Sequence, residues 1–213
     1  MVGGSTKTVG GEIMMKNVLI LGATGTLGSA VRQKFLKNTD YHLTLFARSA
    51  NQIDPHPQEN IIAGNVMNAA DLDKAMINQD AVFVALRGPL GVYAEQIIAS
   101  VNRNHVSRLI FITSMGIYNE IPNSIGTANN LEHKPALIPY RQAADAIEAS
   151  DLNYTIIRPG WFMRGPINYV ITQKGQPFGG QYATISSIAD LVLRLVKDDR
   201  LYSRNSVGIS TPN

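Results

Sequence analysis

The 213-residue sequence contains no cysteine. Disulfides, thiol nucleophiles and thiolate metal sites are therefore excluded, and the absence is typical of a protein kept in a reducing compartment, so we expect a cytoplasmic location. A strong charge of either sign is also lacking, because 19 lysines and arginines stand against 16 aspartates and glutamates. The net charge of +3 is too small to indicate a nucleic-acid or membrane partner, and we expect neither.

Several other features are absent. No apolar run approaches the roughly 18 residues that a membrane-spanning helix needs. Residues 1–15 have no apolar segment of the kind found in secretory signals, and their glycine, serine and threonine content predicts a flexible extension or an expression remnant. The four histidines are scattered without an H-x-x-x-H spacing, so no metal site is expected. His133 lies in the loop beside the expected pocket, where it is either a substrate contact or, as the preferred interpretation, an ordinary surface histidine. A G-x-S-x-G motif is missing too, which argues against hydrolase chemistry.

Short apolar segments alternate with segments of helical periodicity from residue 16 onward. Strands are expected at 16–21, 41–47, 61–64, 80–86, 107–114 and 153–159, with a last short strand at 206–210. Helices are expected from residue 27, at 68–76 with Asn68 as cap, around 92–101, at 136–150, and around 188–196 with Ser186 or Ser187 as cap. This alternation predicts one α/β domain over residues 16–213, a doubly wound parallel sheet of the Rossmann fold.

The segment "GATGTLG" (22–28) follows the first expected strand and opens the first expected helix. Glycine lets the backbone turn sharply there and come close to a ligand, and the free N–H groups of a helix N-terminus attract a phosphate. Thr24 and Thr26 can add hydroxyl donors. The spacing therefore predicts a pyrophosphate cradle for a dinucleotide, with a purely structural turn as the alternative.

The second strand ends in "LFARS", which places Arg48 and Ser49 where an NAD-binding protein usually has a carboxylate for the ribose. Asp40 precedes the strand and lies at its other end. An arginine at this position pairs with the 2′-phosphate of NADP(H), so NADP(H) is the expected cofactor. The alternative is that Arg48 is an ordinary solvated arginine.

The motifs "GATGTLG", "GNVMNAADLDKAM", "RLIFITSMGIY" and "IEASDLNYTIIRPGWF" resemble those of atypical short-chain dehydrogenase/reductase proteins that bind NAD(P)H. Within that group the chain is similar to the NmrA-like proteins and to the flavin reductase, or biliverdin-IXβ reductase, branch. The resemblance covers about residues 16–200.

Carried over residue by residue, the resemblance implies a set of cofactor contacts along the strand ends. It implies that the pyrophosphate is held by Gly22, Thr24, Gly25, Thr26, Leu27 and Gly28, and the adenosine phosphate by Arg48, beside Ser49. It also implies that Asn65, where the family usually has aspartate, and Val66 flank the adenine, that Ala85, Leu86 and Arg87 lie near the ribose, that Thr113 and Ser114 lie beside the nicotinamide, and that Pro159, Gly160 and Trp161 cover its carboxamide.

The sequence departs from the wider family in one respect, because none of its eight tyrosines is followed by lysine in the pattern Y-x-x-x-K. That pair supplies the proton in ketone and alcohol chemistry. In the family register Ala136 stands at the tyrosine position and Tyr140 at the lysine position. Ser114, Tyr118 and Tyr140 are the candidate replacements, and packed rings with bonded hydroxyls are the alternative for the two tyrosines.

Two functions are compatible with these features. The first is an NADPH-dependent reductase of a conjugated small molecule such as a flavin or quinone, which leaves a delocalised anion that water can protonate. Only about 50 residues follow the sixth strand, so we expect an open, shallow pocket without a substrate domain. The second is a non-catalytic NADP(H) sensor that regulates a protein partner, of the NmrA-like kind.

Overall fold

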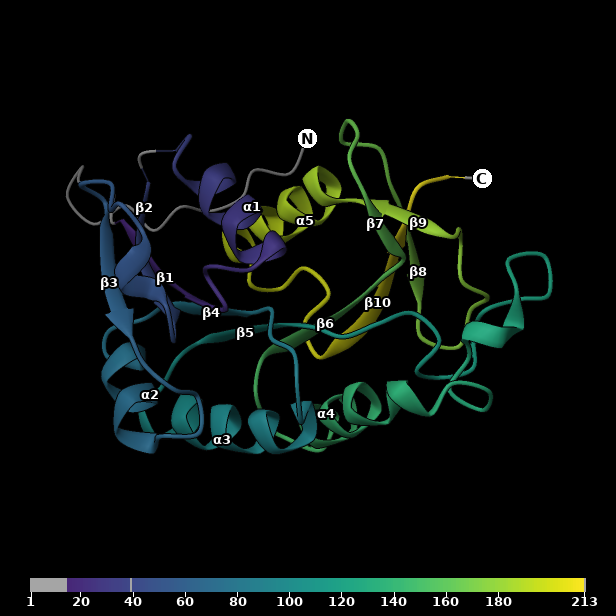
Figure 1. Cartoon of the computed structure of the whole chain (residues 1–213), viewed down its shortest axis with the longest axis horizontal. Coiled ribbons are helices and arrows are strands. Elements are labelled where there is room, and N and C mark those ends of the chain that lie inside the picture. Colours follow the sequence, from purple (N-terminus) through teal and green to yellow (C-terminus); the bar gives the residue numbers. More distant parts are fainter. Residues whose placement is uncertain (1–14, 39, 213) are drawn as a thin grey trace.

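Figure 1 shows the computed structural model of the chain, which describes residues 15–38 and 40–212. Apart from residue 15, the expected N-terminal extension lies outside the described residues. A mixed eight-stranded sheet forms the centre, in the order β3-β2-β1-β4-β5-β6-β10-β8. Its strands are β1 (Lys16–Leu21), β2 (Tyr41–Ala47), β3 (Glu59–Ala63), β4 (Ala81–Val84), β5 (Arg108–Ile112), β6 (Tyr154–Pro159), β8 (Val170–Gln173) and β10 (Asn205–Ser210).

All neighbouring pairs from β3 to β10 are parallel, and only β8 runs antiparallel to its neighbour, β10. Helices cover both faces of the sheet (Figure 1). The helices α2 (Ala69–Met76), α3 (Leu90–Arg103) and α4 (Ile138–Glu148) pack on one face, while α1 (Thr26–Phe35) and α5 (Ile185–Lys197) pack on the other. The doubly wound Rossmann architecture expected from the sequence is therefore confirmed.

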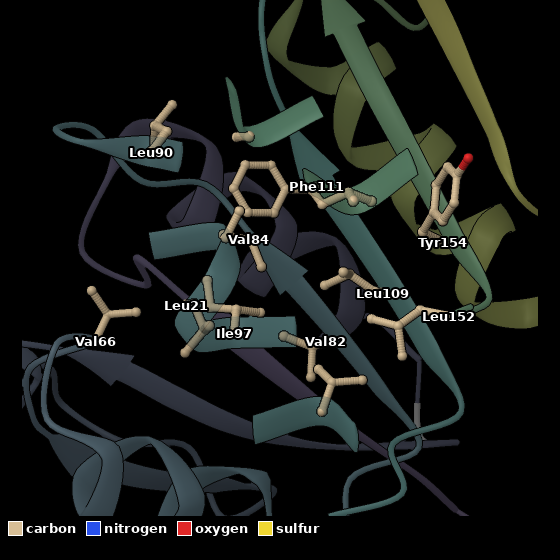
Figure 2. Close-up of a cluster of buried hydrophobic side chains, with 14 of the residues drawn as sticks. Leu21, Val66, Val82, Val84, Leu90, Ile97, Leu109, Phe111, Leu152 and Tyr154 are labelled. Carbon is tan, nitrogen blue, oxygen red and sulfur yellow. The ribbon is translucent and has the colours of Figure 1, made fainter. Parts of the chain in front are cut away.

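The apolar core lies in two layers, one on each side of the sheet. In β1 the four residues from Val18 to Leu21 are all buried, because successive side chains point to opposite faces and both faces are covered. Figure 2 shows the layer beneath α3 and α4, in which Val84, Phe111 and Ile97 lie together. Because such strands are apolar along their whole length, they could be recognised in the sequence.

Two local expectations need correction. Helix α5 is capped by Thr184, whose side-chain oxygen accepts from the backbone N–H of Ser187, and neither Ser186 nor Ser187 is the cap. The helix begins earlier than its apolar periodicity indicates, so its cap lies outside the serine pair. Asn68, by contrast, caps α2 as expected, accepting from the N–H groups of Ala70 and Asp71.

The segment after β6 contains three short strands that the sequence analysis did not predict. The strands β7 (Trp161–Met163) and β9 (Tyr182–Thr184) form a separate two-stranded parallel sheet, and β8 joins the edge of the main sheet. Strands of three or four residues, separated by segments rich in glycine and proline, are too short to show a usable periodicity. The segment packs onto the main domain, where β8 pairs with β10 at the edge of the main sheet.

Candidate functional site

Parallel strands bring the ends of β1, β2, β4, β5 and β6 to one edge of the sheet. Most of the residues expected to bind the cofactor or to donate a proton lie in the segments that follow these strands. The exceptions are Pro159, the last residue of β6, the Asn65–Val66 pair after β3, and Tyr140 in the first turn of α4. Open α/β sheets bind ligands at this edge, where the strands end. Asp40 lies at the opposite edge, where its carbonyl accepts from the backbone N–H of Lys16 at the start of β1.

The three glycines of the loop after β1 have different structural roles. A Cβ on Gly22, whose φ is +92°, would lie 2.3 Å from the carbonyl oxygen of Ala85 at the end of β4. A Cβ on Gly28 would lie 2.2 Å from the carbonyl oxygen of Gly22. The fold itself therefore requires glycine at both positions, whether or not a ligand binds.

Gly25 differs, because its backbone is extended (φ −79°, ψ 168°) and an added Cβ would meet only the carbonyl oxygen of Gly22, at 3.3 Å. Gly25 caps the N-terminus of α1 without a side chain, and no acidic residue stands in the first turn of that helix. The N-terminus of α1 is thus left with amide donors and space in front of them, which suits a phosphate group. Of the three glycines, Gly25 alone has neither a positive φ nor an overlap below 3 Å that would require glycine.

A cavity of about 170 Å³ lies beside this loop, between the ends of β1, β2, β3 and β4. Eight residues expected to hold the cofactor line it, namely Gly22, Thr24, Arg48, Ser49, Asn65, Val66, Leu86 and Arg87. Sequence reasoning missed four others: Phe46, Ala47, Gly64 and Tyr93. Ala47 and Gly64 directly precede the predicted residues Arg48 and Asn65, and Phe46 lies two positions before Arg48, so their places in the sequence could have indicated them. Tyr93 comes from α3, and no local pattern indicates it.

The cavity is electropositive. Arg48 and Arg87 line it, both are exposed, and no aspartate or glutamate is among the lining residues. Neither arginine has an ion-pair partner in the described part of the chain, which contrasts with Arg32, held by Glu59 near the other end of the sheet. Two unpaired guanidinium groups in a carboxylate-free cavity fit a phosphate group, and they do not fit the bare ribose hydroxyls that an acidic residue would bind.

The remaining expected contacts lie along the same edge but outside this cavity. Gly25, Thr26, Leu27 and Gly28 form the start of α1, and Ala85 follows β4. The loop after β5 stays joined to β6, because the backbone N–H of Thr113 donates to the Ile157 carbonyl and that of Met115 to the Pro159 carbonyl. This bonding places Ser114 beside Pro159, Gly160 and Trp161, at the end of the edge away from Arg48.

The three candidate proton donors are not equivalent. Ser114 is half-buried at the edge, next to the end of β6. Tyr140, in the first turn of α4, is half-buried with its ring packed against the core.

The side chain of Tyr118 is held by contacts with other parts of the fold. Its hydroxyl donates to Glu148, the last residue of α4, at 2.8 Å. Burial raises the pKa of this hydroxyl above its usual value, and the hydrogen bond to Glu148 acts in the same direction. The ring of Tyr118 also lies within cation–π distance of Arg141, Arg158 and Lys174. These contacts favour the packed, hydrogen-bonded tyrosine over the proton donor.

Among the described residues there is no group of three or more histidines, aspartates or glutamates arranged to hold a metal ion. Nor does any helix in that part of the chain combine the length and apolarity needed to cross a membrane.

Comparison with known proteins gives consistent results. The model of the NAD(P)H-binding family matches residues 22–199. A Rossmann-fold NAD(P)-binding family protein from Shigella flexneri is 36% identical, with a TM-score of 0.81, and the match covers 93% of this chain and 95% of that one. A short-chain dehydrogenase/reductase from Veillonella parvula, solved in complex with NADP, is 26% identical with a TM-score of 0.85, over 94% of this chain and 96% of that one.

An anaerobillin reductase from Escherichia coli O157:H7 also matches, with 17% identity and a TM-score of 0.76, over 93% of this chain and 98% of that one. At that identity the match shows a shared fold only.

Proposed function

The chain belongs to the NAD(P)H-binding family, and from this premise we propose that it is an NADPH-dependent reductase of a conjugated small-molecule acceptor, of flavin or quinone type. The observation that carries the choice of NADPH is the electropositive cavity, in which Arg48 and Arg87 have no carboxylate partner among the described residues. The NADP complex of the Veillonella relative supports the same choice.

In this proposal the chain binds and orients the cofactor along the edge of the sheet. Arg48, with Ser49 and Thr24 beside it, receives the adenosine phosphate, and the open N-terminus of α1 at Gly25 receives the pyrophosphate. The backbone of Thr113 and Met115, fixed to β6, forms the floor beneath the nicotinamide. The bound cofactor supplies a hydride, and the residues at this end of the edge orient the acceptor that receives it.

We propose a conjugated acceptor because no side chain at this edge stands out as a positioned proton donor. Ketone reduction concentrates negative charge on one oxygen and needs a positioned acid, whereas a flavin or quinone spreads that charge and takes its proton from water. The Tyr118 hydroxyl donates to Glu148, and the register implied by the family resemblance puts Ala136 at the position of the usual tyrosine. A conjugated acceptor therefore suits this edge better than a ketone does.

Arg48→Ala is expected to weaken NADPH binding by about 1–3 kcal/mol, the scale of a lost charge-assisted hydrogen-bonded pair. NADH has no 2′-phosphate, so its affinity should stay within twofold. Titrations of both cofactors, followed by the fluorescence of the dihydronicotinamide, measure the difference. Arg200→Ala, at an exposed arginine outside the cavity, is the matched control. Equal losses for NADPH and NADH would show that Arg48 does not bind the 2′-phosphate.

If water supplies the proton, no single hydroxyl is essential. Ser114→Ala, Tyr118→Phe and Tyr140→Phe should each lower kcat for a flavin or quinone by less than about tenfold, which is under about 1.4 kcal/mol. A positioned general acid contributes roughly a hundredfold or more. Steady-state rates at saturating NADPH, with folding checked by circular dichroism, provide the test. A hundredfold loss at one position with NADPH affinity intact would identify an acid and favour a carbonyl substrate.

The missing tyrosine–lysine pair also supports a second candidate, a non-catalytic NADP(H) sensor. NADPH oxidation measured with a panel of flavins and quinones separates the two. Tight NADPH binding without turnover of any acceptor would favour the sensor and reject the reductase.

A further inference from the structure

Trp161 and Lys134 meet at the nicotinamide end of the sheet edge. Trp161 begins β7, directly after the Pro159–Gly160 pair, and 47% of its surface is exposed. Lys134 comes from the loop that leads into α4, and its ammonium group lies 4.6 Å from the centre of the Trp161 ring. The contact therefore joins the segment after β6 to the segment before α4, next to the loop that carries Ser114.

The charge of Lys134 is not neutralised by an acid. Its ammonium group donates to the neutral side chain of Asn129 at 3.0 Å, and no ion pair within residues 15–38 and 40–212 involves it. Lys174 is a useful contrast, since it is paired with Glu148 at 2.8 Å. A cation held against an aromatic ring without an acidic partner attracts an anion that can lie over the same ring.

The surface around Trp161 is apolar and exposed. Tyr182 is the cross-strand partner of Trp161 in the two-stranded sheet, so the two rings share one face, and Met163 shares that face by strand alternation. Tyr182 is 45% and Met163 42% exposed. A flat conjugated molecule can lie against this face, with its edge at the Lys134 ammonium.

We propose that Trp161 and Lys134 together form the acceptor site, in which the indole takes the flat ring and Lys134 takes its negative charge. This inference rests on the proposed reductase function. On reduction the acceptor gains a hydride, with both electrons of the broken C–H bond of the reduced cofactor, and so gains one negative charge that a proton from water then neutralises. Lys134 stabilises that charge before the proton arrives.

The Trp161–Lys134 pair would stabilise the reduced acceptor in the absence of the Y-x-x-x-K pair. Lys134 stands two residues before Ala136, the family's tyrosine position, and so brings a positive charge to this end of the edge from a different point of the chain. A fixed cation stabilises a delocalised anion electrostatically and does not have to deliver a proton to one atom.

The binding experiment uses the fact that Trp161 is the only tryptophan in the chain, so indole fluorescence reports this site alone. The probes are 1,4-naphthoquinone-2-sulfonate and the neutral 2-methyl-1,4-naphthoquinone, and the absence of cysteine prevents thiol addition to either. Both quinones should quench Trp161 in the wild type, with the sulfonate binding at least fivefold more tightly. Lys134→Gln should abolish that preference, while Lys134→Arg and the distant Lys197→Gln should keep it.

The rate experiment uses the neutral quinone at saturating NADPH. Lys134→Gln should lower kcat about tenfold, with NADPH affinity within twofold of wild type, and Lys134→Arg should recover most of the rate. Wild-type fluorescence that neither quinone changes, or a sulfonate preference that survives in Lys134→Gln, would overturn the acceptor site. A wild type that shows the preference but oxidises no NADPH with any acceptor would instead overturn the proposed reductase and leave the binding site supported.

Discussion

Gly25→Val is expected to lower the affinity for NADPH at least a hundredfold, about 2.7 kcal/mol, in a protein that still folds. Gly25 is in an extended conformation that valine adopts readily, and an added Cβ would meet only the Gly22 carbonyl oxygen, at 3.3 Å. That contact is tight, but a backbone shift of a few tenths of an ångström relieves it, so we expect the variant to fold. It would fill the space in front of the first amides of α1, where the proposal places the pyrophosphate.

The measurement is a titration with NADPH, accompanied by thermal unfolding of the free protein. Gly25→Ala provides a graded control with an intermediate loss of affinity. Gly28→Ala provides the opposite control, because its Cβ would lie 2.2 Å from a backbone oxygen and should destabilise the free protein. A folded Gly25→Val variant with wild-type affinity would refute the pyrophosphate cradle.

Glu120→Leu is expected to reduce the free energy of unfolding by about 3–5 kcal/mol. The side chain of Glu120 is 4% exposed and pairs with the fully buried guanidinium of Arg158 in β6. Its carboxylate also accepts from the backbone N–H groups of Gly116 and Tyr118, at 3.1 and 2.9 Å. Its removal leaves a buried cation and two amides without their acceptor, which is far more costly than losing an exposed pair.

Chemical denaturation followed by circular dichroism gives the free energy, and the corresponding fall in melting temperature is roughly 6–20 °C for a chain of this length. The double variant Glu120→Leu/Arg158→Met should recover much of the loss, because no charge is then left buried without a partner. Arg141→Met, at an arginine whose ion pair with Asp145 is half-exposed, is the matched control and should cost under about 1 kcal/mol. A similarly small loss for Glu120→Leu would mean that the pair contributes little to stability.

The Glu120–Arg158 pair also holds together the edge of the sheet at which β5 and β6 end. Arg158 lies directly before Pro159, and Glu120 lies six residues after Ser114, so the pair anchors the loop that follows β5 against β6. Glu120→Leu should therefore affect the nicotinamide end of the site more than the Arg48 end.

The sequence alone determined the architecture, and it predicted that the glycine loop and Arg48 lie at one edge of the sheet. The apolar runs at β1, β4, β5 and β6 predicted their strands because both faces of this sheet are covered, so each run is continuous and conspicuous. The glycine loop and Arg48 were identified because each directly follows a strand, and parallel strands that end at one edge bring such residues together.

The contacts at the other end of this edge, around Tyr118, Lys134 and Trp161, became known only from the tertiary structure. Whether the Tyr118 hydroxyl faces a substrate or Glu148 depends on how the loop after β5 packs against α4. The contact between Lys134 and Trp161 joins segments 27 positions apart that have no common periodicity. Strand and helix patterns arise from local repetition of side chains along one element, whereas these contacts arise from irregular loops whose paths are set by packing against the rest of the fold.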